Sequence, residues 1–177
     1  CNRRSIQDGL TPCYSYSSYG TNPNNWPVAW TNNHTNVSCS WTANGYRLPT
    51  EMEWMFAAKG GTGSQGYTYS GSNTVGNVAW YSVNSAAHTW DVGLKAANEL
   101  GLHDMSGNVW EWCWDIYGDY PSGSQNNPTG AVAGSARVRR GGSWQHGSGN
   151  STVSGRGSYV ATGSVNSIGF RVCRIAP

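Results

Sequence analysis

The combination of 24 glycines with ten tryptophans and ten tyrosines in 177 residues is the strongest constraint on what this chain can fold into. Tryptophan and tyrosine bury large rings but need partners for their N–H and O–H groups. Glycine supplies the positive φ angles that tight turns require. Charged residues make up only 11% of the chain. The composition therefore predicts a loop-rich α+β fold with an aromatic core, and it argues against a helical bundle or a doubly wound sheet.

One helix is clearly predicted, over residues 50–59. Thr50 and Glu53 form a T-x-x-E capping box, and Gly60 follows as the C-terminal stop. We expect the apolar side of this helix to carry Trp54, Phe56, Ala57 and Ala58.

Strands are predicted at residues 108–114, 136–144 and 170–174. The first of these alternates tryptophan with other residues, so one of its faces is aromatic. We expect the helix to pack on a small twisted sheet containing the first and last strands, with four rings largely buried: Trp110, Trp112, Trp114 and Phe170.

Charge and hydropathy exclude two classes of partner. The formal net charge is +2 and no basic run is longer than Arg139-Arg140, whereas a nucleic-acid-binding face needs clustered Lys and Arg. No apolar run approaches the roughly 20 residues that span a bilayer. We therefore expect a soluble protein that binds no nucleic acid.

Cysteine usage leaves the redox compartment open. The five cysteines lack the C-x-x-C spacing of a metal site, and their odd number leaves at least one unpaired within the chain. Cys1 has two interpretations. It could be the lipidated first residue of a mature bacterial lipoprotein, or a cysteine inside a longer domain, and the structured look of the residues after it favours the second.

Residues 146–168 differ from the rest of the chain. Eleven of these 23 residues are Gly or Ser, and none is Trp, Met, Lys, Gln or Glu. The composition of the remaining chain predicts about three of those five types here. The same five types are unreachable when the adenines of an Asn codon ending in a pyrimidine are randomised. A diversified loop would have this composition, and so would an ordinary Gly/Ser-rich loop.

Four ordered motifs carry a family resemblance. GYRLPTEMEWMFAAKGG, GLHDMSGNVWEWCWD, RVRRGGSW and IGFRVCR together resemble the formylglycine-generating-enzyme (sulfatase-modifying) domain. The resemblance implies a C-type-lectin-like fold with little regular secondary structure. A length of 177 residues fits a single domain over 1–177, and the resemblance implies that this domain lacks the N-terminal portion of the family.

The resemblance argues against catalysis. Enzymes of this family oxidise a substrate cysteine with a copper-holding cysteine pair placed shortly after the GGS motif, because soft thiolate ligands hold Cu(I). This chain has no cysteine between Cys113 and Cys173. We therefore expect no oxidase activity, no copper and no required cofactor.

Calcium is a further expectation from the resemblance. Some family members bind Ca²⁺ at the turn that corresponds here to Gly107, Asn108, Val109 and Glu111, and hard oxygen ligands suit that ion. In the alternative interpretation, Asn108 only makes a turn and Glu111 pairs internally with Arg137 or Arg171.

Within the family, the chain resembles the Treponema-type variable proteins of diversity-generating retroelements, whose hypervariable segment lies between GGSW and IGFR. The candidate variable segment is 144–171. Its variable, ligand-binding positions would be His146, Ser148, Asn150, Ser151, Gly155, Ser158, Tyr159, Val160, Thr162, Ser164 and Asn166. Its fixed scaffold positions would include Trp144, Arg156, Phe170 and Arg171. Tyr, Ser, Gly and Asn are also the recognition residues of antibody loops.

The resemblance thus implies a non-catalytic ligand-binding display protein whose ligand is a protein or a glycan. It also implies a bacterial surface location, with a lipid anchor upstream of this sequence. The alternative is an inactive formylglycine-generating-enzyme relative whose Gly/Ser-rich loop has no recognition role.

Overall fold

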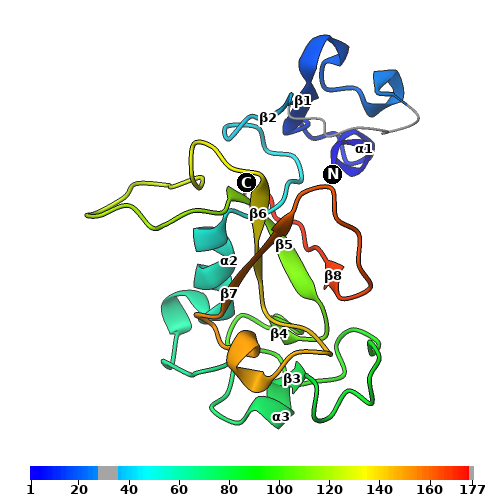
Figure 1. Cartoon of the computed structure of the whole chain (residues 1–177). Coiled ribbons are helices and arrows are strands. Elements are labelled where there is room, and N and C mark those ends of the chain that lie inside the picture. The colour runs from blue at the N-terminus through cyan, green and yellow to red at the C-terminus, as the bar shows by residue number, and fades with distance from the viewer. Residues whose placement is uncertain (28–35, 176–177) are drawn as a thin grey trace. The chain divides into compact units, whose positions relative to one another are not determined.

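The computed structural model describes residues 1–27 and 36–175, which fall into two compact units (Figure 1). The first unit comprises Cys1–Leu48 and the chain from Arg171 onward, and the second comprises Pro49–Phe170. In the first unit the C-terminal end of the chain returns to the N-terminal segment, where the backbones of Arg47 and Cys173 form a β-bridge. The single domain over 1–177 stays a prediction.

The first unit is small and irregular. It holds the helix α1 (Asn2–Gln7), the paired strands β1 (Tyr14–Tyr16) and β2 (Val37–Cys39), and the 3-10 turns η1 (Ser17–Tyr19) and η2 (Pro23–Asn25). The buried side chain of Asn2 donates to the carbonyls of Tyr14 and Thr21. One amide therefore fixes α1 to β1.

The predicted helix of the second unit is confirmed as α2 (Glu51–Ala58). Thr50 Oγ1 accepts from the N–H of Glu53, and the Glu53 carboxylate accepts from the N–H of Thr50, so both halves of the capping box are present. Trp54 and Ala58 are buried as expected. Phe56 is not: it is 58% exposed, because it lies on the other side of the helix.

A four-stranded sheet faces this helix, with the order β7-β6-β5-β8. Its strands are β5 (Trp110–Ile116), β6 (Ala136–Arg140), β7 (Arg156–Val160) and β8 (Ile168–Gly169), and only β8 runs parallel to its neighbour. Smaller elements complete the unit: η3 (Gly61–Gly63), α3 (Val75–Val78), β3 (Ala79–Trp80), β4 (Ser106–Gly107) and η4 (Ser148–Ser151). The α+β, loop-rich prediction is confirmed.

The faces of the sheet differ from the prediction. The side of β5 that packs toward α2 carries Glu111, Cys113 and Asp115, all buried. The tryptophans lie on the opposite face, where Trp110 is buried but Trp112 and Trp114 are only half-buried. Sequence alternation identifies the two faces of a strand but not which one meets the core.

Phe170 and the last predicted strand are also corrected. Phe170 is 66% exposed, and regular pairing with β5 ends at Gly169, so no strand spans 170–174. The hydrophobic core lies instead between α2 and the sheet. It comprises Trp54, Ala58, Met105, Cys113, Val138 and Val153.

Candidate functional site

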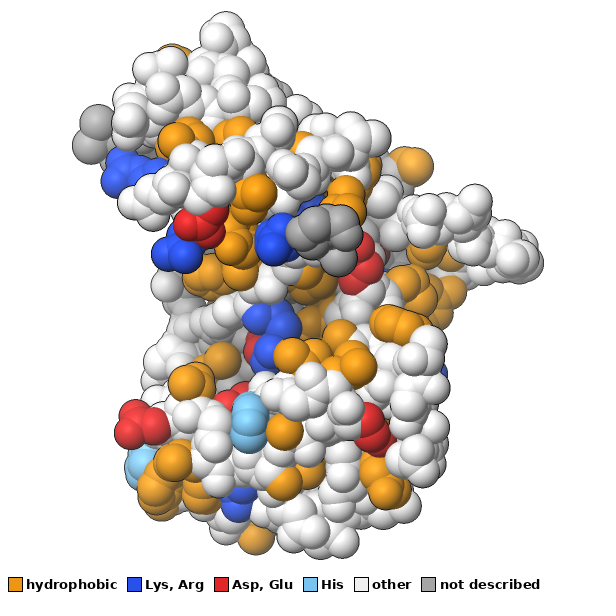
Figure 2. Space-filling view, turned by 180° about the vertical axis from the view of Figure 1, so that it is seen from behind, with side chains coloured by type: hydrophobic (Ala, Val, Ile, Leu, Met, Phe, Trp, Pro, Cys, Tyr) orange, Lys and Arg blue, Asp and Glu red, His pale blue; other side chains and the backbone are white. Residues whose placement is uncertain are grey.

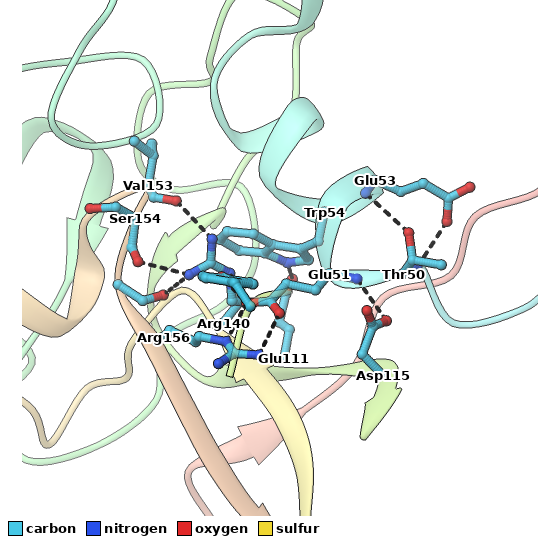
Figure 3. Close-up of polar contacts among 12 residues, drawn as sticks. Thr50, Glu51, Glu53, Trp54, Glu111, Asp115, Arg140, Val153, Ser154 and Arg156 are labelled. Carbon is cyan, nitrogen blue, oxygen red and sulfur yellow. Dashed lines mark hydrogen bonds and ion pairs between the residues drawn. The ribbon is translucent and has the colours of Figure 1, made fainter. Parts of the chain in front are cut away.

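Arg140 holds the candidate segment by its backbone. This arginine at the end of β6 is fully buried, and its terminal nitrogens donate to the carbonyls of Val153, Ser154 and Gly155 (Figure 3). Its guanidinium also lies over the ring of Trp54 and 3.6 Å from Glu51. Three consecutive peptide groups are thus fixed without any contact to their side chains.

Arg156 is the second anchor, at the start of β7. Its Nε and Nη2 donate to the two carboxylate oxygens of Glu51 at 2.8 and 2.9 Å, and its Nη1 donates to Gly118 O. The rings of Tyr117 and Tyr120 each lie 4.3 Å from its guanidinium. A two-point pair of this kind fixes direction as well as distance. The contacts of Arg156 therefore join β7 to Glu51 and to Gly118.

The acidic side of the anchor is itself supported. The backbone N–H of Glu51 donates to Asp115 Oδ2 at 2.8 Å, and Tyr120 donates its hydroxyl proton to Glu51. Trp54 Nε1 donates to Glu111 Oε2 at 2.7 Å. Burial raises the pKa of Asp115 to about 6, with the nearby charge of Glu51 adding to the shift. Glu51, Asp115 and Glu111 therefore belong to a network of buried charged groups beneath the 146–166 segment.

Most other contacts of the segment also use its backbone. The carbonyls of His146 and Ser151 accept from Ser82 N and Ser106 Oγ, and the N–H of Val153 donates to Thr68 O. The carbonyl of Ser167 accepts from Trp110 N. The β6–β7 ladder, with Val138 opposite Ser158, is likewise a backbone interaction. Peptide groups are common to all residues, so side chains here can change while these bonds persist.

The eleven predicted variable positions fall into three groups by exposure. Those at the surface are Asn150, Val160, Thr162, Ser164 and Asn166. Those that are half-buried are His146, Ser148, Gly155, Ser158 and Tyr159. Ser151 alone is fully buried. The segment is also more ordered than its composition indicates, since it contains η4 and β7.

Two of the predicted variable positions, Ser151 and Gly155, are closely packed. Ser151 is 0% exposed, and its Oγ would lie 2.6 Å from a Cβ at Gly142. A Cβ at Gly155 would meet the carbonyl oxygen of Asn150 at 2.5 Å. Neither position offers room for a larger side chain, and the variability of both stays a prediction. Buried Ser and structural Gly cannot be told apart from surface Ser and Gly by composition.

The sequence did not identify the aromatic face of the sheet as part of this region. Arg139 lies over Trp110 and Tyr159, at 4.7 and 5.4 Å from their ring centroids. Trp112 is 6.4 Å from Tyr159. The available signal was the alternation of tryptophans in β5 together with Arg137 and Arg139 in β6, because side chains of neighbouring strands share a face.

His146, at the start of the 146–166 segment, contacts this aromatic face through Trp110. Its Nδ1 accepts from Trp110 Nε1 at 3.3 Å and from the hydroxyl of Ser143 at 2.7 Å. An indole N–H can only donate, so the ring proton sits on Nε2. Burial lowers the pKa of His146, and the charge of Arg139 lowers it further. The imidazole is therefore neutral near pH 7.

The other predicted scaffold positions, Trp144, Phe170 and Arg171, have different surroundings. Trp144 is fixed by its backbone, whose N–H donates to Asn108 O and whose carbonyl accepts from Ser85 Oγ. Phe170 is exposed, so it does not support the segment by burial. Arg171 belongs to the first unit.

The turn predicted to bind calcium has its polar groups directed at protein partners. Asn108 adopts φ 60° and both accepts from and donates to the backbone of Trp90. Its carbonyl accepts from Trp144 N, while Glu111 turns into the buried network. No three His, Cys, Asp or Glu side chains in the described ranges are grouped as metal ligands. Calcium binding at Gly107, Asn108, Val109 and Glu111 stays a prediction.

Comparison with known proteins identifies the family of this chain. Residues 13–176 match the family described as "Sulfatase-modifying factor enzyme 1-like domain". The chain is 37% identical to "Chaperone protein LppX" of Paenibacillus barcinonensis, over 98% of its own length and 65% of that protein. It is 36% identical to the formylglycine-generating enzyme of Streptomyces coelicolor, over 78% of its length and 52% of that enzyme.

A solved structure of a related protein also resembles this chain in its fold. "Treponema denticola variable protein 1" matches with a TM-score of 0.84 and 36% identity, over 99% of this chain and 66% of that one. The chain therefore spans about half to two thirds of the length of these relatives. No helix among residues 1–27 and 36–175 is long and apolar enough to cross a membrane.

Proposed function

The chain belongs to the sulfatase-modifying factor enzyme 1-like domain family, and within that family we propose that it is a ligand-binding display domain. Its specificity is set by side chains of the 146–166 segment, which a retroelement diversifies. One observation carries the proposal: Arg140 and the β6–β7 ladder hold the segment through backbone atoms.

This mode of attachment separates stability from recognition. Side chains at Asn150, Thr162, Ser164 and Asn166 are exposed and contribute little to the core. Surface substitutions away from buried groups usually change the free energy of unfolding by less than about 0.5 kcal/mol. Many sequences at these positions are therefore compatible with one backbone, as in loops displayed on rigid scaffolds.

Absence of oxidase chemistry is part of the proposal. The sequence has no cysteine from 114 to 172. Of the two cysteines that flank this gap, Cys113 is fully buried, and burial raises its pKa far above its ordinary value. A buried thiol of this kind is neither a nucleophile nor a copper ligand. Purified protein supplied with copper, oxygen and a sulfatase-type cysteine peptide should form no aldehyde, and turnover above the metal-only background would contradict the proposal.

The ligand is proposed to be a protein or glycan surface, and the location a bacterial cell surface with a lipid anchor. Both follow from the resemblance to variable proteins. An inactive enzyme relative without a recognition role is the second candidate, favoured by the identity with formylglycine-generating enzymes.

Sequencing the same locus from several isolates separates the two candidates. Diversification predicts a nearby near-duplicate of the coding region for 144–171, with differences confined to positions where the duplicate has adenine. Those differences should fall at exposed positions such as Thr162 and Ser164 and spare Ser151 and Gly155. Differences scattered evenly, or the absence of a duplicate, would support the inactive relative.

A further inference from the structure

The face of the sheet opposite α2 carries a guanidinium without a counter-ion. Arg139 extends along this face beside Gly157, where a Cβ would meet its Nε at 3.1 Å. Its Nε is buried and donates to no acceptor. Within residues 1–27 and 36–175, no carboxylate pairs with it, and none of its nitrogens forms a hydrogen bond. This differs from Arg140 and Arg156, whose nitrogens engage protein oxygens.

The surroundings of Arg139 cover one part of its guanidinium and leave another part open to a ligand. Trp110 and Tyr159 lie against the guanidinium, and Nε faces the protein. The two terminal nitrogens, which are not among the buried unpartnered atoms, remain accessible. Paired N–H groups in one plane match the two oxygens of a carboxylate. His146 contacts the same Trp110 ring; its acceptor nitrogen Nδ1 is already engaged by Trp110 Nε1, which leaves Nε2–H as its donor.

A second, independent feature lies next to this group. β7 is the edge strand of its sheet, beyond β6 (Figure 1). Along β7 the peptide groups point alternately toward β6 and toward the outer edge, and no strand of the described chain pairs with that outer edge. Unpaired N–H and C=O groups on a strand edge can pair with an extended peptide. Hydrophobic side chains lie next to the few Lys and Arg side chains on the face drawn in Figure 2.

We propose that an acidic, extended protein segment binds along the outer edge of β7, with one of its carboxylates paired to Arg139. This inference rests on the proposed function, because β7 lies inside the 146–166 segment, and it names the ligand class of that site. Backbone pairing supplies contacts that do not depend on the diversified side chains. Arg139 lies outside the segment and would be a fixed anchor for every variant, while Ser158, Tyr159 and Val160 tune selectivity.

The test uses two short peptides, Ac-Thr-Val-Glu-Val-Thr-amide and the same peptide with Gln in place of Glu. Glucuronate, a sugar carboxylate, is titrated separately to test a glycan ligand. Titration of the ¹⁵N-labelled full chain should move the Trp110 indole and β7 amide resonances saturably with the Glu peptide. The Gln peptide should bind about tenfold or more weakly, as expected for loss of a charge-assisted contact. Arg139→Gln should remove the preference for Glu over Gln. Arg137→Gln, with the same change in charge on the same face, should keep it.

Each other outcome has a definite meaning. No saturable shift with the Glu peptide, equal binding of both peptides, or an unchanged Glu preference in Arg139→Gln would overturn the proposal. Binding of glucuronate without the peptide would overturn the protein class of ligand. An amide spectrum of Arg139→Gln that matches the parent outside this face establishes that the variant is folded. Peptide binding with an invariant locus would leave the Arg139 site standing and refute diversification alone.

Discussion

Arg156 and Glu51 form a two-point ion pair that joins β7 to α2, with both contacts within 2.9 Å. The Glu51 side chain is 2% exposed and that of Arg156 is 17% exposed. Glu51 also neutralises Arg140, so one carboxylate serves both arginines that hold the 146–166 segment.

Replacing Glu51 should therefore be costly. Glu51→Gln leaves two buried or half-buried guanidinium groups without their carboxylate, and breaking such a pair costs about 3–5 kcal/mol. Urea unfolding followed by tryptophan fluorescence measures the change. The control is Asp8→Asn, which breaks the exposed Arg4–Asp8 pair and should cost much less, because solvent screens the charges of that pair. Equal losses for both variants would contradict the anchoring role of Glu51.

Asp115 should make stability depend on pH. Its pKa is raised to about 6 by burial, so the folded state holds its proton through a range where the unfolded state has lost it. The contribution of Asp115 to stability is then greatest below about pH 4, is lost as the pH rises to 6, and changes little above that. Asp115→Asn keeps an acceptor for Glu51 N and should raise the free energy of unfolding at pH 7.5 by at most about 3 kcal/mol.

The check is to compare urea unfolding of the parent and Asp115→Asn at pH 4 and pH 7.5. The gain in the variant should be present at pH 7.5 and nearly absent at pH 4. A gain of the same size at both values would show that ionisation of Asp115 is not its cause.

Exposed and buried serines of the 146–166 segment should respond differently to enlargement. Ser151→Val adds volume to a fully buried position against Gly142, and overpacking of this kind costs about 1–3 kcal/mol. Ser164→Val, at the surface, should change the unfolding free energy by less than about 0.5 kcal/mol. Thermal melting of the two variants beside the parent is sufficient, and a stable Ser151→Val protein would return Ser151 to the variable set.

Tyr159 and Gly163 should be coupled. A Cβ at Gly163 would overlap the ring of Tyr159, so Gly163→Ala requires that ring to move. We expect a loss of about 1–3 kcal/mol from Gly163→Ala in the parent and much less in a Tyr159→Ser background. A double-mutant cycle by chemical denaturation measures the difference. Additive effects would mean that the ring moves freely, and that position 159 can vary independently of 163.

Calcium is tested by its effect on melting. The side-chain groups of Asn108 and the Trp54-bonded oxygen of Glu111 are engaged with the protein, so EGTA should leave the melting temperature unchanged. A ligand bound only by the folded state would raise it by mass action. A rise on adding calcium, reversed by EGTA, would support the calcium prediction for the 107–111 turn.

Local signals were read correctly where the interaction is local. The Thr50–Glu53 capping box lies within one helical turn, so four residues contain all of its physics. The strand predicted at 108–114 is present as β5, displaced by two residues to Trp110–Ile116, and it too follows from a short motif. Phe56, Trp112 and Phe170 were placed wrongly because burial depends on which face meets α2, and that is decided by residues distant in sequence.

The sequence by itself determined the family, the loop-rich α+β class, the capped helix and the absence of a cysteine between Cys113 and Cys173, since these reside in residue identity and short spacing. Only the tertiary structure decided which serines and glycines of 146–166 are closely packed, and that Arg139 has no carboxylate partner among the described residues. Arg139 and Arg140 are adjacent and chemically identical, yet the pleat of β6 directs them to opposite faces. One meets Glu51 and three carbonyls, and the other meets aromatic rings and solvent.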